Sequence, residues 1–112
     1  MAPKARCYLI LLLAALLGAC DFDESRRAEI LGHTPLGTNI DAVMKFCESQ
    51  RLSCKRSDTA GFLNQDTGRT VGVRSVWVTV DPGRFRNTAA YWGFSADGKL
   101  VDVWVWTTYD AL

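Results

Sequence analysis

Residues 89–106, AAYWGFSADGKLVDVWVW, decide the fold of this 112-residue chain. Two runs of alternating side chains, about Ala89 to Phe94 and Leu100 to Thr108, predict two β-strands. Asp97-Gly98 between them is a strong β-hairpin signal, because these residues tolerate the backbone conformations of a tight turn. The stretch therefore predicts an antiparallel pair of strands.

A third strand is predicted just upstream. Valines alternate with Trp77 and Thr79 from Val76 to Val80, and Asp81-Pro82-Gly83 follows with proline second and glycine third in a turn. The three strands together predict an antiparallel meander sheet.

The register of the predicted hairpin assigns its side chains to two faces. With Asp97-Gly98 as a two-residue turn, Trp92 would pair with Val103, and the other predicted pairs are Phe94 with Val101, Tyr91 with Trp104 and Ala89 with Trp106. One face then carries Trp92, Phe94, Val101, Val103 and Val105, and the other carries Tyr91, Gly93, Asp102, Trp104 and Trp106.

The second of these faces is the candidate binding surface. Trp77 joins it by strand parity, so it would hold Trp77, Tyr91, Trp104 and Trp106. Tryptophan and tyrosine offer large rigid contact areas and are favoured as anchors of protein interfaces. Two interpretations stay open: the rings bind a partner, or they belong to the core beneath the helix or a folded-over loop.

An amphipathic helix is predicted from Gly37 to near Gln50. Asn39 or Thr38 is placed to cap its start. Its apolar stripe has the spacing i, i+3, i+4 and i+7 and consists of Ile40, Val43, Met44 and Cys47. The expected fold is α+β, with this helix covering the aliphatic face of a three- to four-stranded sheet.

Cys47 and Cys54 are expected to form a disulfide. Cys47 lies on the core stripe of the helix, and Leu52 and Cys54 point inward from a predicted short strand. In an oxidising compartment such a pair is most simply a disulfide. The alternatives are two buried thiols, or a metal or redox site, although His33 is the single histidine and CxxC spacing is absent.

Residues 55–70 are polar apart from Phe62-Leu63. Serine, aspartate, threonine, asparagine, glutamine and glycine dominate this segment. It is interpreted as a long loop or a poorly patterned hairpin.

The N-terminus has the pattern of a secretory signal. The apolar run Tyr8 to Ala19 follows Lys4 and Arg6, and it would span about 18 Å as a helix, short of the roughly 30 Å hydrocarbon core of a membrane. A basic start, a short apolar run and small residues at its end predict a signal peptide over residues 1–19.

Leu17-Gly18-Ala19-Cys20 resembles the lipobox of bacterial lipoproteins. This resemblance implies cleavage before Cys20 and acylation of Cys20, which would anchor the mature chain to a membrane on its periplasmic side. Asp21 resembles the signal for retention at the inner membrane, with the outer membrane as the other destination. The alternative is an ordinary signal peptide followed by a chance cysteine.

The expected organisation after cleavage is a tether over residues 20–35 and one small α+β domain over residues 36–112. Loss of Lys4 and Arg6 would change the formal net charge from +1 to −1. A nearly neutral domain without a basic stripe lacks the electrostatic signature of nucleic-acid binding.

No catalytic pattern is evident, so we expect a non-enzymatic protein without cofactor or metal. The motifs of phosphate loops and activated nucleophiles are absent, and His33 falls in the predicted tether. Asp97 and Asp102 are the carboxylates considered, one in a turn and one among aromatic residues. Arg84-Phe85-Arg86 could meet an acidic partner or lipid headgroups, or be a solvated loop.

The chain resembles the small SmpA/OmlA-type lipoproteins, through the lipobox, the segment Gly37-Thr38-Asn39-Ile40-Asp41-Ala42-Val43 and the strands that follow. The order of elements is also similar to the repeat of β-lactamase-inhibitor-like folds. These resemblances imply a lipid-anchored module that binds an envelope protein through its sheet, as an assembly or adaptor lipoprotein. The alternative function is an inhibitor or immunity-type lipoprotein that blocks an envelope-directed enzyme or toxin.

Overall fold

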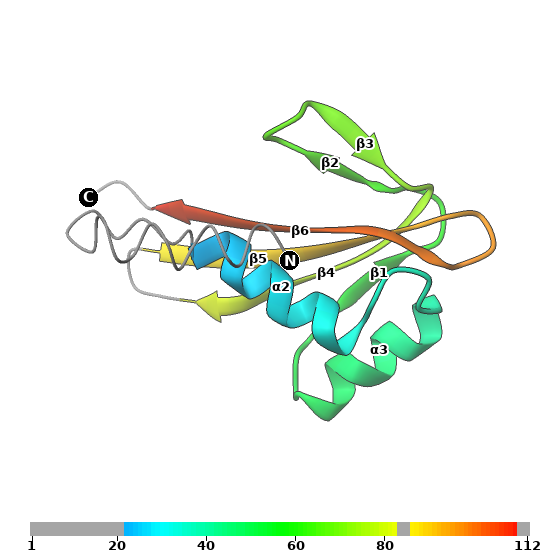
Figure 1. Cartoon of the computed structure of the whole chain (residues 1–112), viewed down its shortest axis with the longest axis horizontal. Helices are drawn as coiled ribbons and strands as arrows, with labels where there is room; N and C mark the ends of the chain where they lie inside the picture. The colour runs from blue at the N-terminus through cyan, green and yellow to red at the C-terminus, as the bar shows by residue number, and fades with distance from the viewer. Residues whose placement is uncertain (1–21, 83–85, 110–112) are drawn as a thin grey trace.

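The computed structural model describes residues 22–82 and 86–109. They form an α+β fold with two helices, a four-stranded antiparallel sheet and a separate two-stranded sheet (Figure 1). The α+β class is therefore confirmed, while the architecture has one more helix and one more small sheet than the sequence predicted. The predicted signal peptide, Cys20 and Asp21 lie outside the described residues.

The elements follow one another in a simple order. The helices are α2 (Phe22–His33) and α3 (Ile40–Ser49). The strands are β1 (Lys55–Ser57), β2 (Phe62–Asn64), β3 (Arg69–Val71), β4 (Arg74–Pro82), β5 (Arg86–Phe94) and β6 (Leu100–Tyr109). The large sheet has the order β1-β4-β5-β6, and β2 pairs with β3 in a hairpin that projects from it (Figure 1).

Helix α3 forms as predicted and is capped by Asn39. The Asn39 side chain accepts a hydrogen bond from the Asp41 N–H at 2.8 Å, which satisfies a backbone donor at the helix start. Ile40, Val43 and Cys47 are buried, so the apolar stripe faces the sheet.

The end of α3 turns the chain back toward the helix. The Leu52 N–H donates to the Cys47 carbonyl and the Arg51 N–H donates to the Glu48 carbonyl. Arg51 has a φ of 57°. These are the bonds and the left-handed residue of a Schellman motif, with arginine in the position that usually holds glycine. The reversal carries Cys54 back alongside Cys47.

Two segments after α3 differ from the prediction. Strand β1 begins at Lys55, so the predicted strand around Leu52 and Cys54 is wrong, although both side chains pack against the core as expected. The disulfide explains the difference, because it holds Cys54 to α3. Within residues 55–70, the hairpin interpretation is the correct one.

The β5–β6 hairpin has the predicted register except near its turn. Gly98, at φ 81°, closes a three-residue loop in which the Gly98 N–H donates to the Ser95 carbonyl and the Ser95 N–H donates to the Lys99 carbonyl. Phe94 consequently pairs with Leu100 rather than Val101. Val101 is an extra residue between this pair and Gly93–Asp102, and it is 44% exposed instead of facing the core.

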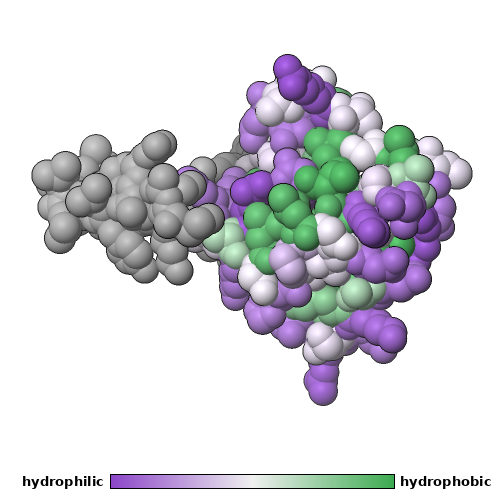
Figure 2. Space-filling view, turned by 45° about the vertical axis from the view of Figure 1, so that its right-hand side comes forward, coloured by the Kyte–Doolittle hydropathy of each residue, from purple (hydrophilic) through white to green (hydrophobic). Residues whose placement is uncertain are grey.

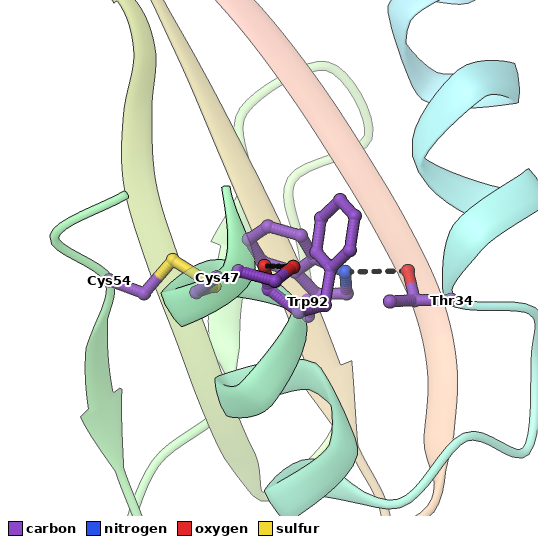
Figure 3. The surroundings of a disulfide bond; sticks show 6 residues. Thr34, Cys47, Cys54 and Trp92 are labelled. Atoms are coloured by element: carbon purple, nitrogen blue, oxygen red, sulfur yellow. Dashed lines mark hydrogen bonds between the residues drawn. A yellow bond between two sulfur atoms is a disulfide. The ribbon is translucent and has the colours of Figure 1, made fainter. Parts of the chain in front are cut away.

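The main core lies between the sheet and the helices. It contains the predicted aliphatic face of the sheet together with apolar residues from both helices: Ile30, Ile40, Val43, Cys47, Val76, Val78, Ala90, Trp92, Phe94, Leu100, Val103 and Val105. Trp92 is fully buried and its Nε1 donates to the Thr34 hydroxyl at 3.0 Å (Figure 3). Burial of this face supplies the principal driving force for folding.

The predicted tether over residues 20–35 is wrong for its described part. Residues 22–33 form α2, which packs along β6, and Thr34 is buried against Trp92. Helix α2 buries Ile30 but owes much of its position to polar contacts with β6. The folded unit thus includes residues that the sequence assigned to a linker.

Helix α2 and the loop before α3 together cover the outer edge of β6. Asp23 accepts hydrogen bonds from the Thr107 N–H and hydroxyl, and Arg27 Nε donates to the Val103 carbonyl at 2.7 Å. Further along, the Leu100 N–H donates to the Thr38 carbonyl at 2.8 Å. Backbone groups that an edge strand would leave unpaired are satisfied here.

Candidate functional site

The four predicted aromatic residues share one face of the sheet, opposite α2 and α3. Trp77, Tyr91 and Trp104 form one row across β4, β5 and β6, because Trp77 pairs with Tyr91 and Tyr91 pairs with Trp104. Trp106 stacks on Trp104 with ring centroids 5.1 Å apart. We call Trp77, Tyr91, Trp104 and Trp106 the aromatic face.

The β2–β3 hairpin covers part of this face. Phe62 of β2 stacks on Trp104 at 6.0 Å and packs against Tyr91 at 5.6 Å. Asp66, in the turn of the hairpin, accepts a hydrogen bond from Trp104 Nε1 at 2.9 Å. Trp104 is consequently only 6% exposed.

The two interpretations of the aromatic face therefore apply to different residues of that face. Trp104 belongs to a second, smaller core under the hairpin, whereas Trp77, Tyr91 and Trp106 are half-buried. Sequence reasoning missed the roles of Phe62 and Asp66. The apolar pair Phe62-Leu63 in a polar segment was the available signal, but no local pattern indicated that it would cross the sheet.

A groove of about 340 Å³ opens beside the hairpin on the same face. Trp77 and Tyr91 form one wall and the β2 strand forms the other, where Leu63 is 50% exposed. Its lining residues are Ser57, Ala60, Gly61, Phe62, Leu63, Ser75, Trp77 and Tyr91. This groove is the candidate binding site.

Exposed apolar side chains also occur elsewhere on the surface. Figure 2 shows apolar groups gathered among polar ones on one face of the molecule. Among the side chains whose exposure the structure describes, the large exposed aliphatic ones are Leu36, Leu63, Val73 and Val101. Of these, Leu63 lines the groove.

A second cleft, of about 190 Å³, lies between α2 and α3. His33 stacks on Phe46 with ring centroids 5.3 Å apart, and both line the cleft. The cleft is lined by Arg26, Glu29, Ile30, His33, Phe46, Gln50, Leu52 and Trp92. Four of its eight lining residues are polar or charged, and two of these, Arg26 and Glu29, pair with one another at 3.5 Å.

The Cys47–Cys54 disulfide is confirmed (Figure 3). Its Cα atoms are 6.1 Å apart, and it joins the last turn of α3 to the segment that leads into β1. Cys47 and Cys54 are therefore not two buried thiols in this structure. Free cysteines do not occur among the residues that the structure describes.

The two aspartates considered as hidden carboxylates have structural contacts. Asp97 accepts a hydrogen bond from the Ser95 hydroxyl within the β5–β6 turn, and this bond lowers the pKa of Asp97. Asp102 pairs with Arg27 of α2 at 2.6 Å rather than lying among aromatic rings. Neither residue lines the groove.

An exposed ion-pair network joins three elements on the α3 side of the sheet. Asp58 accepts hydrogen bonds from Arg74 and Arg56, and both guanidinium groups lower the pKa of Asp58, Arg74 more strongly. Arg56 also pairs with Asp41 of α3 at 2.8 Å. The network links α3, β1 and β4 at the surface.

Some predicted sites cannot be placed. Cys20 and Asp21 lie outside the described residues, as do Arg84 and Phe85, while Arg86 is described only as the first residue of β5. Within residues 22–82 and 86–109, no helix has the length and hydropathy needed to span a membrane. The same residues contain no group of three side chains suited to hold a metal ion.

Comparisons with known proteins identified no family model, curated protein or solved structure that matches this chain.

Proposed function

We propose that this chain is a lipid-anchored, periplasm-facing protein-binding module that captures an envelope protein in the groove beside Trp77 and Tyr91. The observation that carries the proposal is the partial exposure of these two rings next to Phe62 and Leu63. Half-buried aromatic residues in a concave apolar site are the usual anchors of protein interfaces. An assembly or adaptor role, as the SmpA/OmlA resemblance implies, is the specific form of this proposal.

The membrane anchor is supported by the sequence pattern. The apolar run up to Ala19 and the Leu17-Gly18-Ala19-Cys20 motif favour cleavage before Cys20 and acylation of that cysteine. Asp21 favours retention at the inner membrane. Intact mass of the mature protein should equal residues 20–112 plus lipid, and a Cys20→Ala precursor that remains processed and membrane-bound would exclude the anchor.

The groove is tested by site-specific photo-crosslinking in cells. A benzophenone amino acid at Leu63, which is half exposed and lines the groove, should give a discrete adduct with one envelope protein. The same group at Lys45, on the exposed side of α3, is the control and should give no such adduct. Equal crosslinking from both positions would argue against a specific groove partner.

Substitution distinguishes partner binding from folding. Trp77→Ala should abolish the adduct from Leu63 while leaving the circular dichroism spectrum unchanged. Leu36→Ala is the matched control, because Leu36 is also highly exposed but lies outside the groove. Trp104 is unsuitable for this purpose, since its burial under the hairpin makes Trp104→Ala a folding mutation that costs about 3–5 kcal/mol.

A further inference from the structure

Helix α2 is fixed to the end of the sheet at which β6 finishes. Its first turn is bound through Asp23 to Thr107, and Arg27 one turn later is bound to the Val103 carbonyl and to Asp102. The helix therefore runs antiparallel to β6, and its N-terminal end lies beside the end of β6 and the start of β5 (Figure 1). We call Asn87, Thr88, Thr107 and Thr108 the anchor end of the sheet.

The chain between Cys20 and α2 is too short to act as a tether. Phe22 is the first residue of α2, so only two peptide units separate it from Cys20. Each unit spans 3.8 Å between Cα atoms, which limits the Cα separation of Cys20 and Phe22 to about 7.6 Å in any conformation. A lipid on Cys20 would hold the folded domain itself, with no flexible linker between them.

Resting on the proposed acylation of Cys20, we propose that the anchor end of the sheet contacts the headgroups of the bilayer that holds the lipid, with the strands directed away from the membrane. The headgroup region is about 5–8 Å deep on each side of a bilayer. The lipid would therefore place the anchor end at, or within, this region.

The chemistry of the anchor end suits hydrated headgroups. Asn87, Thr107 and Thr108 present partly exposed hydroxyl and amide groups, whereas Thr88 is buried and hydrogen-bonds Thr107 at 2.9 Å. Such groups are compatible with an interface and costly to place in hydrocarbon. The contact is therefore expected to be superficial.

The sides of the domain do not favour a flat arrangement on the membrane. The exposed surface of α2 carries Glu24 and Glu29, and Arg26 pairs with Glu29 at 3.5 Å, so this side presents no polybasic cluster that would bind anionic lipids. On the opposite face, the β2–β3 hairpin projects from the sheet (Figure 1). In an upright domain the groove opens parallel to the membrane. Trp77 and Tyr91 lie one same-face row of strand residues farther from the membrane than Trp106. The partner would therefore be a membrane-proximal segment of another envelope protein.

The test measures the distance of two labelled positions from the membrane surface. The mature lipoprotein carries a fluorophore on Thr108→Cys at the anchor end or on Ala96→Cys in the β5–β6 turn, and is inserted into phosphatidylcholine vesicles with nitroxide-labelled headgroups. About 26 Å of strand separates these positions, so the label at 108 should be quenched at least about threefold more strongly than that at 96.

A linker variant separates geometry from anchoring. Sixteen Gly/Ser residues, a linker length of about 20 Å, inserted between Asp21 and Phe22 should leave vesicle binding intact but reduce quenching at position 108 to the level at 96. Equal quenching of the two labels without the linker would overturn the proposed orientation and leave the anchor standing. A mature protein without lipid mass that fails to enter vesicles would overturn the anchor, and the orientation with it.

Discussion

Gly93 is the residue that allows the hairpin to cross the aromatic face. It is buried on β5 directly beneath β2 and β3, and a Cβ atom there would lie 2.7 Å from Val71 Cγ1 and 2.9 Å from Phe62 Cε2. Contacts this short require the hairpin backbone to move. The absence of a side chain at position 93 thus permits the contact between Phe62 and Trp104.

Gly93→Ala should destabilise the protein by about 1–3 kcal/mol, the usual cost of overpacking a closed site. Urea denaturation followed by circular dichroism measures the change. Gly32→Ala is the matched control, because a Cβ at Gly32 meets nothing within 4 Å and alanine should stabilise α2 by about 0.5–1 kcal/mol. A Gly93→Ala protein as stable as the wild type would contradict the close packing of the hairpin.

The Asp58 carboxylate should make stability depend on pH in the acid range. Arg74 and Arg56 lower the pKa of Asp58 in the folded state below the ordinary aspartate value of about 3.9. A group whose pKa is lowered by folding contributes stability above the unfolded value, and this contribution is lost as the pH falls through the folded value. The effect is small because the network is exposed to solvent.

The measurement is an NMR titration of the Asp58 carboxyl carbon, whose midpoint should lie below the ordinary aspartate value of about 3.9. Urea denaturation at pH 3 and at pH 7 then measures how the free energy of unfolding depends on pH. Asp58→Asn should lose less stability on acidification than the wild type, and an identical pH dependence of both proteins would contradict the assigned pairing.

At the level of elements, the turn after α3 and the disulfide form one unit. The Schellman motif reverses the chain at Arg51, and this reversal allows Cys54 to reach Cys47 across a sequence separation of 7. The closed loop restricts the unfolded chain, which on the entropy model contributes about 2.5 kcal/mol to stability.

Reduction of the disulfide should therefore lower the free energy of unfolding by about 2–3 kcal/mol. Urea denaturation with and without a reductant measures the difference. The double variant Cys47→Ala, Cys54→Ala is the control, because reductant should not change its stability. If reductant left the wild type unaffected, the loop would contribute nothing to stability.

The elements differ in how well the sequence predicted them. Helix α3 was predictable because its apolar stripe and Asn39 cap are local signals. The register of β5 and β6 was also predicted correctly on the side of Gly93 that lies away from the turn. It was correct because two irregularities offset one another: the loop has three residues instead of two, and Val101 forms a bulge that restores the pairing. Bulges leave little trace in side-chain alternation.

Helix α2 was missed for a different reason. Among the described side chains of α2, only that of Ile30 is buried. The segment therefore lacks the apolar stripe by which amphipathic helices are recognised. Its position depends on Asp23 and Arg27, whose partners lie more than seventy residues away in sequence. Long-range polar contacts of this kind are invisible to local patterns.

On the scale of the whole molecule, α2 should be required for folding. A fragment of residues 36–112, the domain boundary that the sequence predicted, would lose the burial of Ile30, worth about 2 kcal/mol, and the partner of Trp92 Nε1. We expect this fragment to lose cooperative thermal unfolding by circular dichroism. Residues 22–112 are the control and should unfold cooperatively. Matching transitions in the two fragments would show that α2 is dispensable.

The aromatic face shows what the sequence could and could not predict about the site. Strand parity placed Trp77, Tyr91, Trp104 and Trp106 on one face correctly. It could not show that the β2–β3 hairpin would bury Trp104 and leave a groove beside Tyr91, because that depends on how a polar segment folds across the sheet.

The covered edge of β6 limits how copies of this protein can associate. A sheet that is open on both edges can add neighbours without end and grow into a fibre. Here α2 and the loop before α3 close one edge of the four-stranded sheet, and only the side formed by β1 and β4 lacks a strand partner within the described residues. Strand-to-strand association through this sheet would consequently stop at a pair, which makes polymerisation through it geometrically self-terminating.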